Sequence, residues 1–166
     1  MTASTAMAWG GILLAPGVAL AGPAPGIVDG EACNDPGAVR VEKTGQHWEP
    51  LDVSATAYGP ATLTINKTTT LTHTFKLNAG VDIKVVSVSA GFDVAHAEAV
   101  AVQGSFQAPA DPPGARWVLS AEVRVQDHLV YACQGGKLVR VGHVGQKLNQ
   151  IGFTHYEVSP TPYIPG

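Results

Sequence analysis

The clearest pattern in the chain is an alternation of polar and apolar side chains between Ala61 and Leu77. Every even position from 62 to 74 is threonine apart from Asn66, and the odd positions are mainly apolar: Leu63, Ile65, Leu71 and Phe75. Successive side chains of a strand point to opposite faces, so the run predicts one strand with a threonine face and an apolar face. At about 3.3 Å per residue it would span about 55 Å, several times the usual strand length. Such a strand suits an elongated sheet, an assembly surface or a membrane-inserting hairpin better than a compact enzyme core.

Shorter runs predict that the rest of the domain is also built from strands. The expected strands are Ala38–Lys43, Leu51–Ala57, Val81–Ala90, Phe92–Phe106, Arg116–Val125, Leu129–Cys133, Lys137–Val144 and Gly152–Val158. The alternation slips at Val85–Val86, which indicates a β-bulge or a strand that crosses between two packing environments. The alanines between 95 and 101 also fit a short helix. Turns are expected at 58–60, 78–80 and 126–128, with a firm break at 109–114. The predicted fold is all-β, an elongated antiparallel sheet or sandwich with long threonine-rich strands.

The two ends of the chain differ in composition from the middle. Ala6–Ala21 is apolar and rich in small residues, and Ala19-Leu20-Ala21 before Gly22 has the pattern of a signal-peptide cleavage site. Residues 1–21 are therefore predicted to be a secretory signal peptide. No Lys or Arg precedes the apolar stretch, which leaves open a start further upstream. Residues 22–37 are expected to form an extended tail, 38–158 a single domain and 159–166 a proline-rich tail, and we expect the protein to be secreted and extracellular.

The chain has two cysteines, Cys33 and Cys133. In an oxidising compartment two cysteines most simply pair with each other, so an internal disulfide is predicted. A loop of about 100 residues closed in this way is worth up to about 4.7 kcal/mol in loop-closure entropy. The bridge would tie the N-terminal tail to a strand in the second half of the chain. Two free buried thiols, or a bridge to a partner molecule, are the alternatives.

Charge and motifs argue against several classes of function. The net charge is −3 and charged residues make up 14% of the chain, so no nucleic-acid surface is predicted. There is no Gly-x-Ser-x-Gly elbow. Ile27–Gly30 resembles the N-terminus of an activated trypsin-like protease, but the catalytic segments of that class are missing. We therefore expect no enzymatic activity and no cofactor, and a secreted hydrolase is the least supported alternative.

Histidines and aromatic residues are the remaining candidates for chemistry. His73 and His96 lie in predicted strands, and neutral imidazoles brought together would bind a metal or sense pH. They lack the spacing of a metal motif, so ordinary strand histidines are the favoured interpretation and no metal site is predicted. Four aromatic residues would line a sugar or partner surface, although core or edge positions are more usual: Trp48, Tyr58, Trp117 and Tyr131.

Long Ser/Thr-rich alternating strands, followed by a turn and further alternation, resemble the β-module of aerolysin and epsilon-toxin-like pore formers. The matching run extends from Ala61 to Val125. The resemblance implies a pore-forming alternative in which Val81–Ala101 refolds into a membrane hairpin. The chain departs from this family because it has no room for a sizeable receptor-binding domain and because the alternation slips inside the would-be hairpin. The apolar hairpin residues under this alternative are Val81, Ile83, Val85, Val100 and Val102.

The apolar leader, the cysteine pair, the threonine-rich strand and the Pro/Gly-rich tail resemble small secreted β-proteins of actinomycetes, among them the adaptor subunit of the umbrella toxin particles. That family joins a lectin-like subunit to a repeat-bearing toxin subunit and has no catalysis of its own. The resemblance implies an assembly, adaptor or binding subunit whose partners are other secreted proteins. We expect the tail, Gly22–Ala32 with Ile27 and Val28, to add a strand to the sheet edge of a partner. Membrane contact is expected only under the pore-forming alternative.

Overall fold

The structure, a computed structural model, describes residue 26 and residues 28–158. The predicted signal peptide, Ile27 and the predicted C-terminal tail lie outside the described residues. Within them the chain forms β1 (Val39–Tyr58), β2 (Ala61–Thr72), β3 (Thr74–Leu77), α1 (Ile83–Ala90), β4 (Ala97–Ala108), β5 (Arg116–Gln134) and β6 (Lys137–Val158). The prediction of an elongated all-β fold is confirmed.

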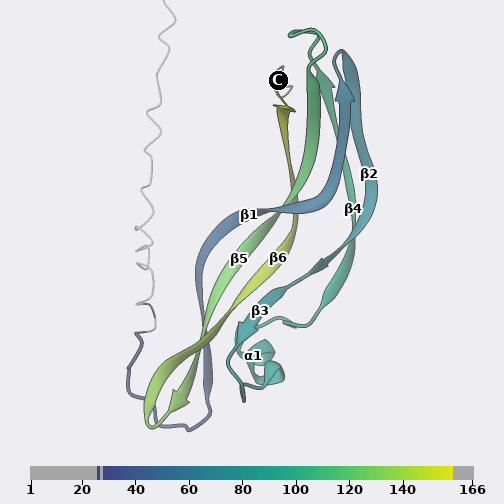
Figure 1. The fold of residues 1–166 in the computed structure, drawn as a ribbon. Helices are drawn as coiled ribbons and strands as arrows, with labels where there is room; N and C mark the ends of the chain where they lie inside the picture. The colour runs from purple at the N-terminus through teal and green to yellow at the C-terminus, as the bar shows by residue number, and fades with distance from the viewer. Residues whose placement is uncertain (1–25, 27, 159–166) are drawn as a thin grey trace, which may run out of the picture.

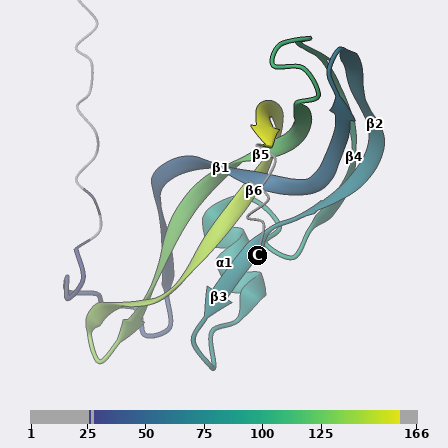
Figure 2. The same ribbon diagram turned by 45° about the horizontal axis from the view of Figure 1, so that its top comes forward.

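The strands form two antiparallel sheets. The larger sheet has the order β1-β5-β6-β3, and the smaller sheet pairs β2 with β4. β1, β5 and β6 run along the length of the molecule, whereas β2 and β4 lie together against its upper part in Figure 1. β3 and α1 lie at the lower part, and the turned view of Figure 2 shows the same arrangement. The upper part is therefore a two-layer sandwich, and the lower part is a sheet covered by one helix.

The threonine-rich run forms two strands rather than the single strand predicted from Ala61 to Leu77. β2 ends at Thr72, His73 interrupts it, and β3 resumes at Thr74. β2 pairs with β4 in the small sheet and β3 pairs with β6 in the large sheet, so the chain passes from one layer to the other at His73. The predicted faces of β2 are confirmed, since its even positions are exposed and its buried positions are Leu63, Ile65 and Leu71.

The prediction of a bulged strand at Val81–Ala90 is wrong, because this segment contains α1. Asp82 caps the N-terminus of the helix, with its side chain accepting a hydrogen bond from Lys84 N at 2.8 Å. Gly91 ends the helix in the left-handed conformation at φ +77°, and its N–H donates to Ser87 O. The turn predicted at 78–80 consequently leads into a helix and not into a second strand of a hairpin.

Helical spacing explains the apparent slip in the alternation. Ile83, Val86 and Ala90 follow one another at intervals of three and four residues, which places them on one side of a helix. Val86 is fully buried, and Ile83 and Ala90 pack around it in the same apolar cluster. The adjacent valines at positions 85 and 86 therefore face different surroundings because the helix turns and not because a strand bulges.

Three pairs of predicted strands are each one continuous strand, since β1, β5 and β6 contain 20, 19 and 22 residues. The turn predicted at Gln126–His128 does not exist. This part of β5 pairs with β1 on one side and with β6 on the other, and the hydrogen bonds on both sides hold polar residues in a strand. Register shifts in the neighbouring strands absorb the irregular residues as bulges. The strand predicted from Phe92 begins only at Ala97, and the break at 109–114 is confirmed.

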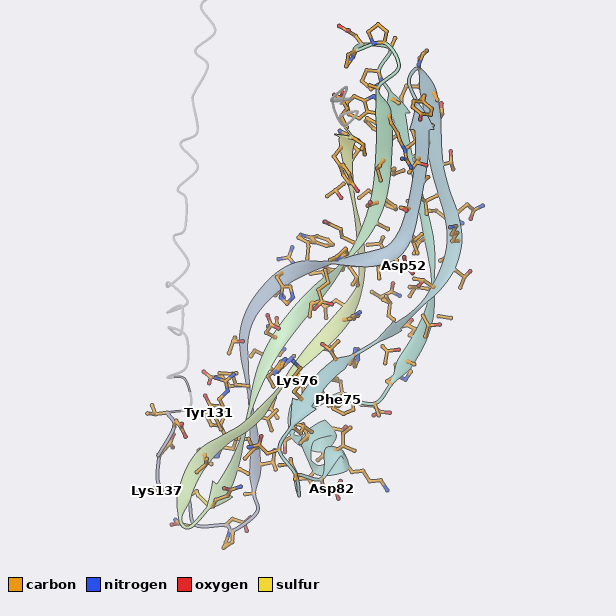
Figure 3. All side chains as sticks on the ribbon, in the orientation of Figure 1. Asp52, Phe75, Lys76, Asp82, Tyr131 and Lys137 are labelled. Carbon is orange, nitrogen blue, oxygen red and sulfur yellow. A yellow bond between two sulfur atoms is a disulfide. The ribbon has the colours of Figure 1, made fainter. Side chains whose placement is uncertain are left out.

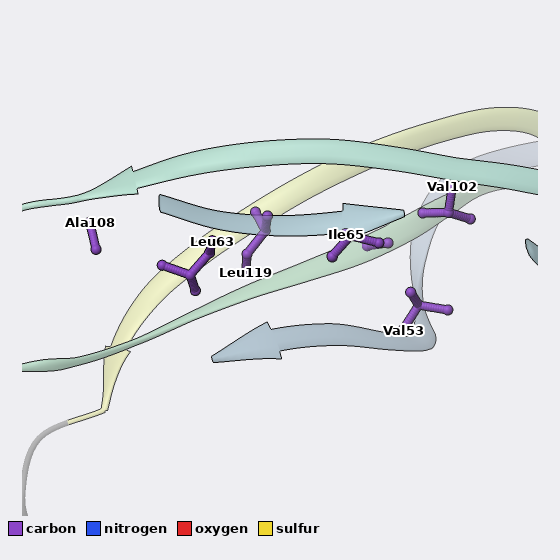
Figure 4. Close-up of a cluster of buried hydrophobic side chains, with 7 residues drawn as sticks. Val53, Leu63, Ile65, Val102, Ala108 and Leu119 are labelled. Carbon is purple, nitrogen blue, oxygen red and sulfur yellow. The ribbon is translucent and has the colours of Figure 1, made fainter. Parts of the chain in front are cut away.

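The main core lies between the two sheets of the upper part, where buried residues of β2 and β4 face those of β1 and β5. Its members, drawn in Figure 4, are Val53, Leu63, Ile65, Val102, Ala108, Leu119 and Ala121. A second core lies between α1 and the large sheet, where Val86 packs with Val130 and Val144. The molecule is thus held together by two apolar layers that share β5.

The N-terminal tail is fastened around the end of the β5–β6 hairpin. The predicted disulfide is present, and it joins Cys33 to Cys133 across 100 residues of sequence. On the β6 side, Gly30 N donates to Leu138 O at 2.7 Å. On the β1 side, Cys133 N donates to Ala38 O at 2.9 Å. The tail therefore encloses the hairpin from both edges, and the bridge closes this enclosure covalently.

The substitution Asp82→Ala should lower the free energy of unfolding by about 1 kcal/mol, because the first turn of α1 loses its side-chain cap. Amide hydrogen exchange should accelerate in α1 while β2 and β4 keep their protection. Asp52→Ala is the matched control, since Asp52 is an exposed aspartate of β1. Equal effects of the two substitutions on α1 would contradict the capping role.

Removing the disulfide with the double variant Cys33→Ser/Cys133→Ser should lower the free energy of unfolding by up to about 4.7 kcal/mol, the loop-closure value for about 100 residues. Urea unfolding of the variant and of the reduced wild type should give the same midpoint, well below that of the oxidised wild type. Coincident midpoints for the oxidised and reduced wild type would show that the bridge does not stabilise the fold.

Candidate interaction surface

The side of the large sheet that faces away from β2 and β4 carries exposed aromatic and charged side chains. Residues opposite one another on neighbouring antiparallel strands share a face. The register places Tyr58 opposite Arg116, so the two side chains share a face. Arg116 is at an even position of β5, whereas the core residues Leu119 and Ala121 are at odd positions and therefore point to the other face. We call this surface the outer face. Its aromatic and charged members are Trp48, Tyr58, Arg116, Glu122, Arg124 and Tyr156.

The aromatic side chains of the outer face are large and accessible. Trp48, Tyr58 and Tyr156 are 43%, 67% and 52% exposed. The Trp48 ring lies over Gly152 of β6, where an added β-carbon would come within 3.0 Å of the ring. The Arg124 guanidinium lies 5.5 Å from the centre of the same ring, within cation–π distance. A larger residue at position 152 would therefore need the Trp48 ring to move by a few tenths of an ångström.

A network of amides fixes the lower border of the outer face. Arg124 Nε donates to Gln46 Oε1 at 2.9 Å, and Gln46 Nε2 donates to Gln126 Oε1 at 2.8 Å. Gln126 Nε2 also donates to the carbonyl oxygen of Gly45 at 2.7 Å. Gly45 lies in the register shift between β1 and β5, so the network ties the irregular part of β1 to the centre of the sheet. Arg124 is thereby positioned next to Trp48.

A separate cluster of charged groups around His47 lies on the opposite face of the sheet, because the register places His47 opposite Val125. His47 Nδ1 lies 2.9 Å from Asp127 and its Nε2 lies 3.3 Å from Glu49. Partial burial lowers the pKa of His47, but the hydrogen bonds to Asp127 and Glu49 outweigh it, and the pKa is raised above 6.5. Lys147 Nζ approaches Glu49 at 3.6 Å. The site is half-exposed, so these ion pairs contribute modestly to stability.

Two other histidines, His73 and His128, pack against the same aromatic ring, that of Phe92. The Phe92 ring lies 5.3 Å from the ring of His73 and 5.2 Å from that of His128. His128 is only 1% exposed, its Nδ1 lies 3.1 Å from Gln126 O, and its Nε2 has no partner among the described residues. Nδ1 therefore carries the hydrogen and donates it to the carbonyl. Burial lowers the pKa of His128 below 6.5, so this imidazole is neutral at pH 7.

His73, singled out in the sequence together with His96, marks the point where the chain changes sheets. Its Nδ1 accepts a hydrogen bond from Lys147 N at 3.1 Å. Burial lowers the pKa of His73, and the nearby charge of His96 lowers it further. No group of three or more His, Cys, Asp or Glu that could hold a metal ion is found in residue 26 and residues 28–158. The hypothesis of a pH-sensing pair stays a prediction, and the structure adds His128 as the more buried histidine.

A cavity of about 220 Å³ lies between the start of α1 and the disulfide-bonded end of the sheet. Among the described residues, Asp82 is its only charged lining residue, and Figure 3 shows Asp82 at the base of the helix. Its carboxylate accepts the capping hydrogen bond of α1. The other lining residues are mostly apolar or contribute backbone, including Val39, Val81, Val85 and Ala132. The one carboxylate that lines the cavity among the described residues is thus engaged in capping α1.

The tail residues proposed for partner binding are divided between described and undescribed parts of the chain. Ile27 lies outside the described residues, and Val28 is 65% exposed. From Gly30 onward the tail bonds to its own sheet, and Ala32 forms an isolated bridge with Lys137. The role of Ile27 and Val28 in binding a partner stays a prediction.

The residues of the would-be pore hairpin do not form a hairpin in this structure. Val81 precedes α1, whereas Ile83 and Val85 lie within it. Val100 and Val102 are buried in β4. The pore-forming alternative stays a prediction, and it would require α1 to unfold into a strand. The described part of the chain has no helix with the length and apolar character needed to cross a membrane.

Of the aromatic residues named from the sequence, Trp48 and Tyr58 lie on the outer face, whereas Tyr131 is buried and Trp117 packs against Phe106. Sequence reasoning missed Tyr156 and the two arginines of the outer face. The available signal was the alternation of strand Gly152–Val158, which puts Tyr156 on the same face as Gly152. No protein-family model matches the chain, and a comparison with curated proteins found no match.

The buried histidines predict a loss of stability in acid. Because the pKa of His128 is lowered in the folded state, its contribution is present above pH 6.5 and is lost as the pH falls below that value. The substitution His128→Leu should therefore flatten the fall in the free energy of unfolding between pH 7 and pH 5, measured by urea titration at each pH.

His47→Gln is the contrasting variant. The pKa of His47 is raised, so its contribution is present below pH 6.5 and is lost as the pH rises through the folded-state pKa. This variant should steepen the acid-side loss instead of flattening it. Parallel pH profiles for wild type and His128→Leu would contradict the assignment to His128.

Proposed function

We propose that the chain is a secreted, non-catalytic subunit that assembles with other secreted proteins in an extracellular, toxin-type complex. The observation that carries the proposal is the composition of the outer face, where exposed Trp and Tyr side chains lie beside arginines on a rigid sheet. Tyr, Trp and Arg are enriched at the energetic centres of protein–protein interfaces. A sheet paired along its length presents these side chains with little loss of conformational entropy on binding.

Other features support the setting of this proposal. The Cys33–Cys133 bridge is of a kind that persists in oxidising compartments, which supports export from the cell. The resemblance to the adaptor subunit of umbrella toxin particles supports an assembly role. The tail, with Ile27 and Val28, would be a second contact whose main chain adds to a partner's sheet edge.

The proposal is tested by recovering partners from the culture medium with tagged protein. Tyr58 and Arg116 are neighbours on the outer face, and the variant Tyr58→Ser/Arg116→Ser removes one aromatic and one cationic contact. Loss of a hot spot worth about 2 kcal/mol weakens binding about 30-fold. We expect the purified partner to bind this variant at least that much more weakly, as measured by titration.

The matched control is Thr64→Ala/Thr68→Ala, which changes two exposed side chains on the opposite side of the molecule. It should bind the partner as the wild type does. A third protein, which lacks residues 22–28, distinguishes the contribution of the tail to partner binding from that of the outer face. Undiminished binding by the outer-face variant would refute the outer face as the contact surface, and dye release from liposomes by the wild type would favour the pore-forming alternative.

A further inference from the structure

Half of the main-chain groups in the upper part of β6 point away from the rest of the sheet. In an antiparallel pair, residues that bond to the partner strand alternate with residues whose N–H and C=O point outward. Gly59 N donates to Ala115 O, so the main chain of Ala115 points towards the β1 side. Every second residue of β5 does the same, and Leu119 therefore bonds to β1. Ser120 therefore bonds to β6, where its partner is Thr154.

The alternation then points the outer N–H and C=O groups of the odd positions away from β5, and no strand of the described residues pairs with them: Ile151, Phe153, His155 and Glu157. Within the described residues, β3 pairs with β6 only between Gly142 and Gly145. All residues from 153 to 157 are exposed. We call Ile151–Val158 the open edge. It is regular throughout, since no register shift interrupts its pairing with β5.

The opposite edge of the same sheet is protected against strand addition, and the open edge is not. β1 contains Pro50 and two register shifts, which bend an edge strand and remove a main-chain donor. The open edge contains neither proline nor lysine, and its one carboxylate is that of Glu157. Exposed edges of this regularity pair readily with another strand.

The side chains of the open edge complement themselves when it pairs with a copy of itself. In an antiparallel pairing about a two-fold axis, opposite residues share a face. One residue must then lie opposite its own symmetry mate, and the axis passes between these two copies. With Thr154 on the axis, threonine faces threonine and Phe153 faces His155, both favourable cross-strand pairs. Tyr156 then lies opposite Gly152 of the other copy, next to the Trp48 ring that already covers this glycine within its own chain.

The neighbouring register with His155 on the axis is less favourable. It would place Phe153 opposite Glu157 and His155 opposite itself, so that the pairing of Phe153 with His155 would be lost. The Thr154 register also places Ile151 opposite Glu157, so that no two like charges meet. His155 already stacks on Phe106 of β4 with ring centres 4.0 Å apart. Phe153 of the second copy would extend this stack.

We infer that two copies of this chain pair through Ile151–Val158 in antiparallel fashion, with Thr154 on the two-fold axis. The pairing joins the two large sheets into one continuous sheet of order β1-β5-β6-β6-β5-β1 in the upper part of the dimer. Their outer faces then lie side by side and point the same way. The inference concerns the edge of the sheet and does not depend on the partner proposed for its face.

Thr154→Cys tests the register directly. The new thiol would lie opposite its symmetry mate at a pair that does not share hydrogen bonds, where Cα atoms approach to about 4.5 Å and a disulfide can form. Under mild oxidation we expect a covalent dimer on non-reducing gels. Ser105→Cys is the matched control, because Ser105 is an exposed residue of the adjacent strand β4, and it should remain monomeric.

His155→Pro tests the contribution of the main chain without the engineered thiol. The N–H of His155 points outward, so proline removes a donor of the dimer while the bonds of β6 to β5 are retained. Relative to His155→Ala, which removes the same imidazole and its stack on Phe106 but keeps the N–H, we expect the dimer dissociation constant of His155→Pro to rise at least tenfold in analytical ultracentrifugation, with a similar thermal unfolding midpoint. Amides of Phe153 and Glu157 should exchange more slowly in concentrated than in dilute wild-type protein.

Two results would overturn the inference. One is a wild type that sediments as a monomer at 100 µM together with a Thr154→Cys variant that does not cross-link. The other is cross-linking of Ser105→Cys as readily as Thr154→Cys, which would indicate pairing through β4 or random collision. A variant of the outer face, Tyr58→Ser/Arg116→Ser, should dimerise normally, so failure of the partner proposal and failure of the dimer are distinguishable.

Discussion

Main-chain pairing along both edges of β5 is the constraint on which the rest of the structure depends. β5 is 19 residues long and is bonded to β1 and β6 through most of that length. The buried face of β5 changes along the strand, because Val123 and Val125 are buried at odd positions whereas His128 and Val130 are buried at even positions. One strand therefore supplies side chains to the sandwich core above and to the helix-covered core below. Because both cores contain residues of β5, this strand connects the sandwich core to the helix-covered core without a third layer.

Alternation along the chain predicted the all-β class and the two faces of β2, because a strand buried on one side has an apolar residue at every second position. The disulfide was also predictable, since only one internal pairing of two cysteines exists. The continuity of the long strands was not. Gln126–His128 has the composition of a turn, and only the presence of partner strands on both sides, far away in sequence, keeps it extended. The helix was missed although Asp82 and Gly91 are residues that typically cap the N-terminus and the C-terminus of a helix.

The candidate surface was predictable only in fragments. Trp48 and Tyr58 stood out as single aromatic residues, but nothing local distinguishes them from Trp117 and Tyr131, which the fold turns inward or buries. Membership of the outer face depends on the register between strands that lie far apart in the sequence. Registers of this kind follow from bulges and from long-range pairing, which no local pattern encodes. The same holds for the meeting of His73 with His128 around Phe92.

The enclosure of the β5–β6 hairpin by the tail has a mechanical consequence. Tension applied to the chain ahead of Gly30 is transmitted by the sulfur bridge from Cys33 directly into β5. It bypasses Val39, where β1 would otherwise begin to peel from the sheet. A force on the N-terminal side is thereby carried by the strand that is held along both flanks, and the tail behaves as a tether anchored in the most firmly bonded element of the fold.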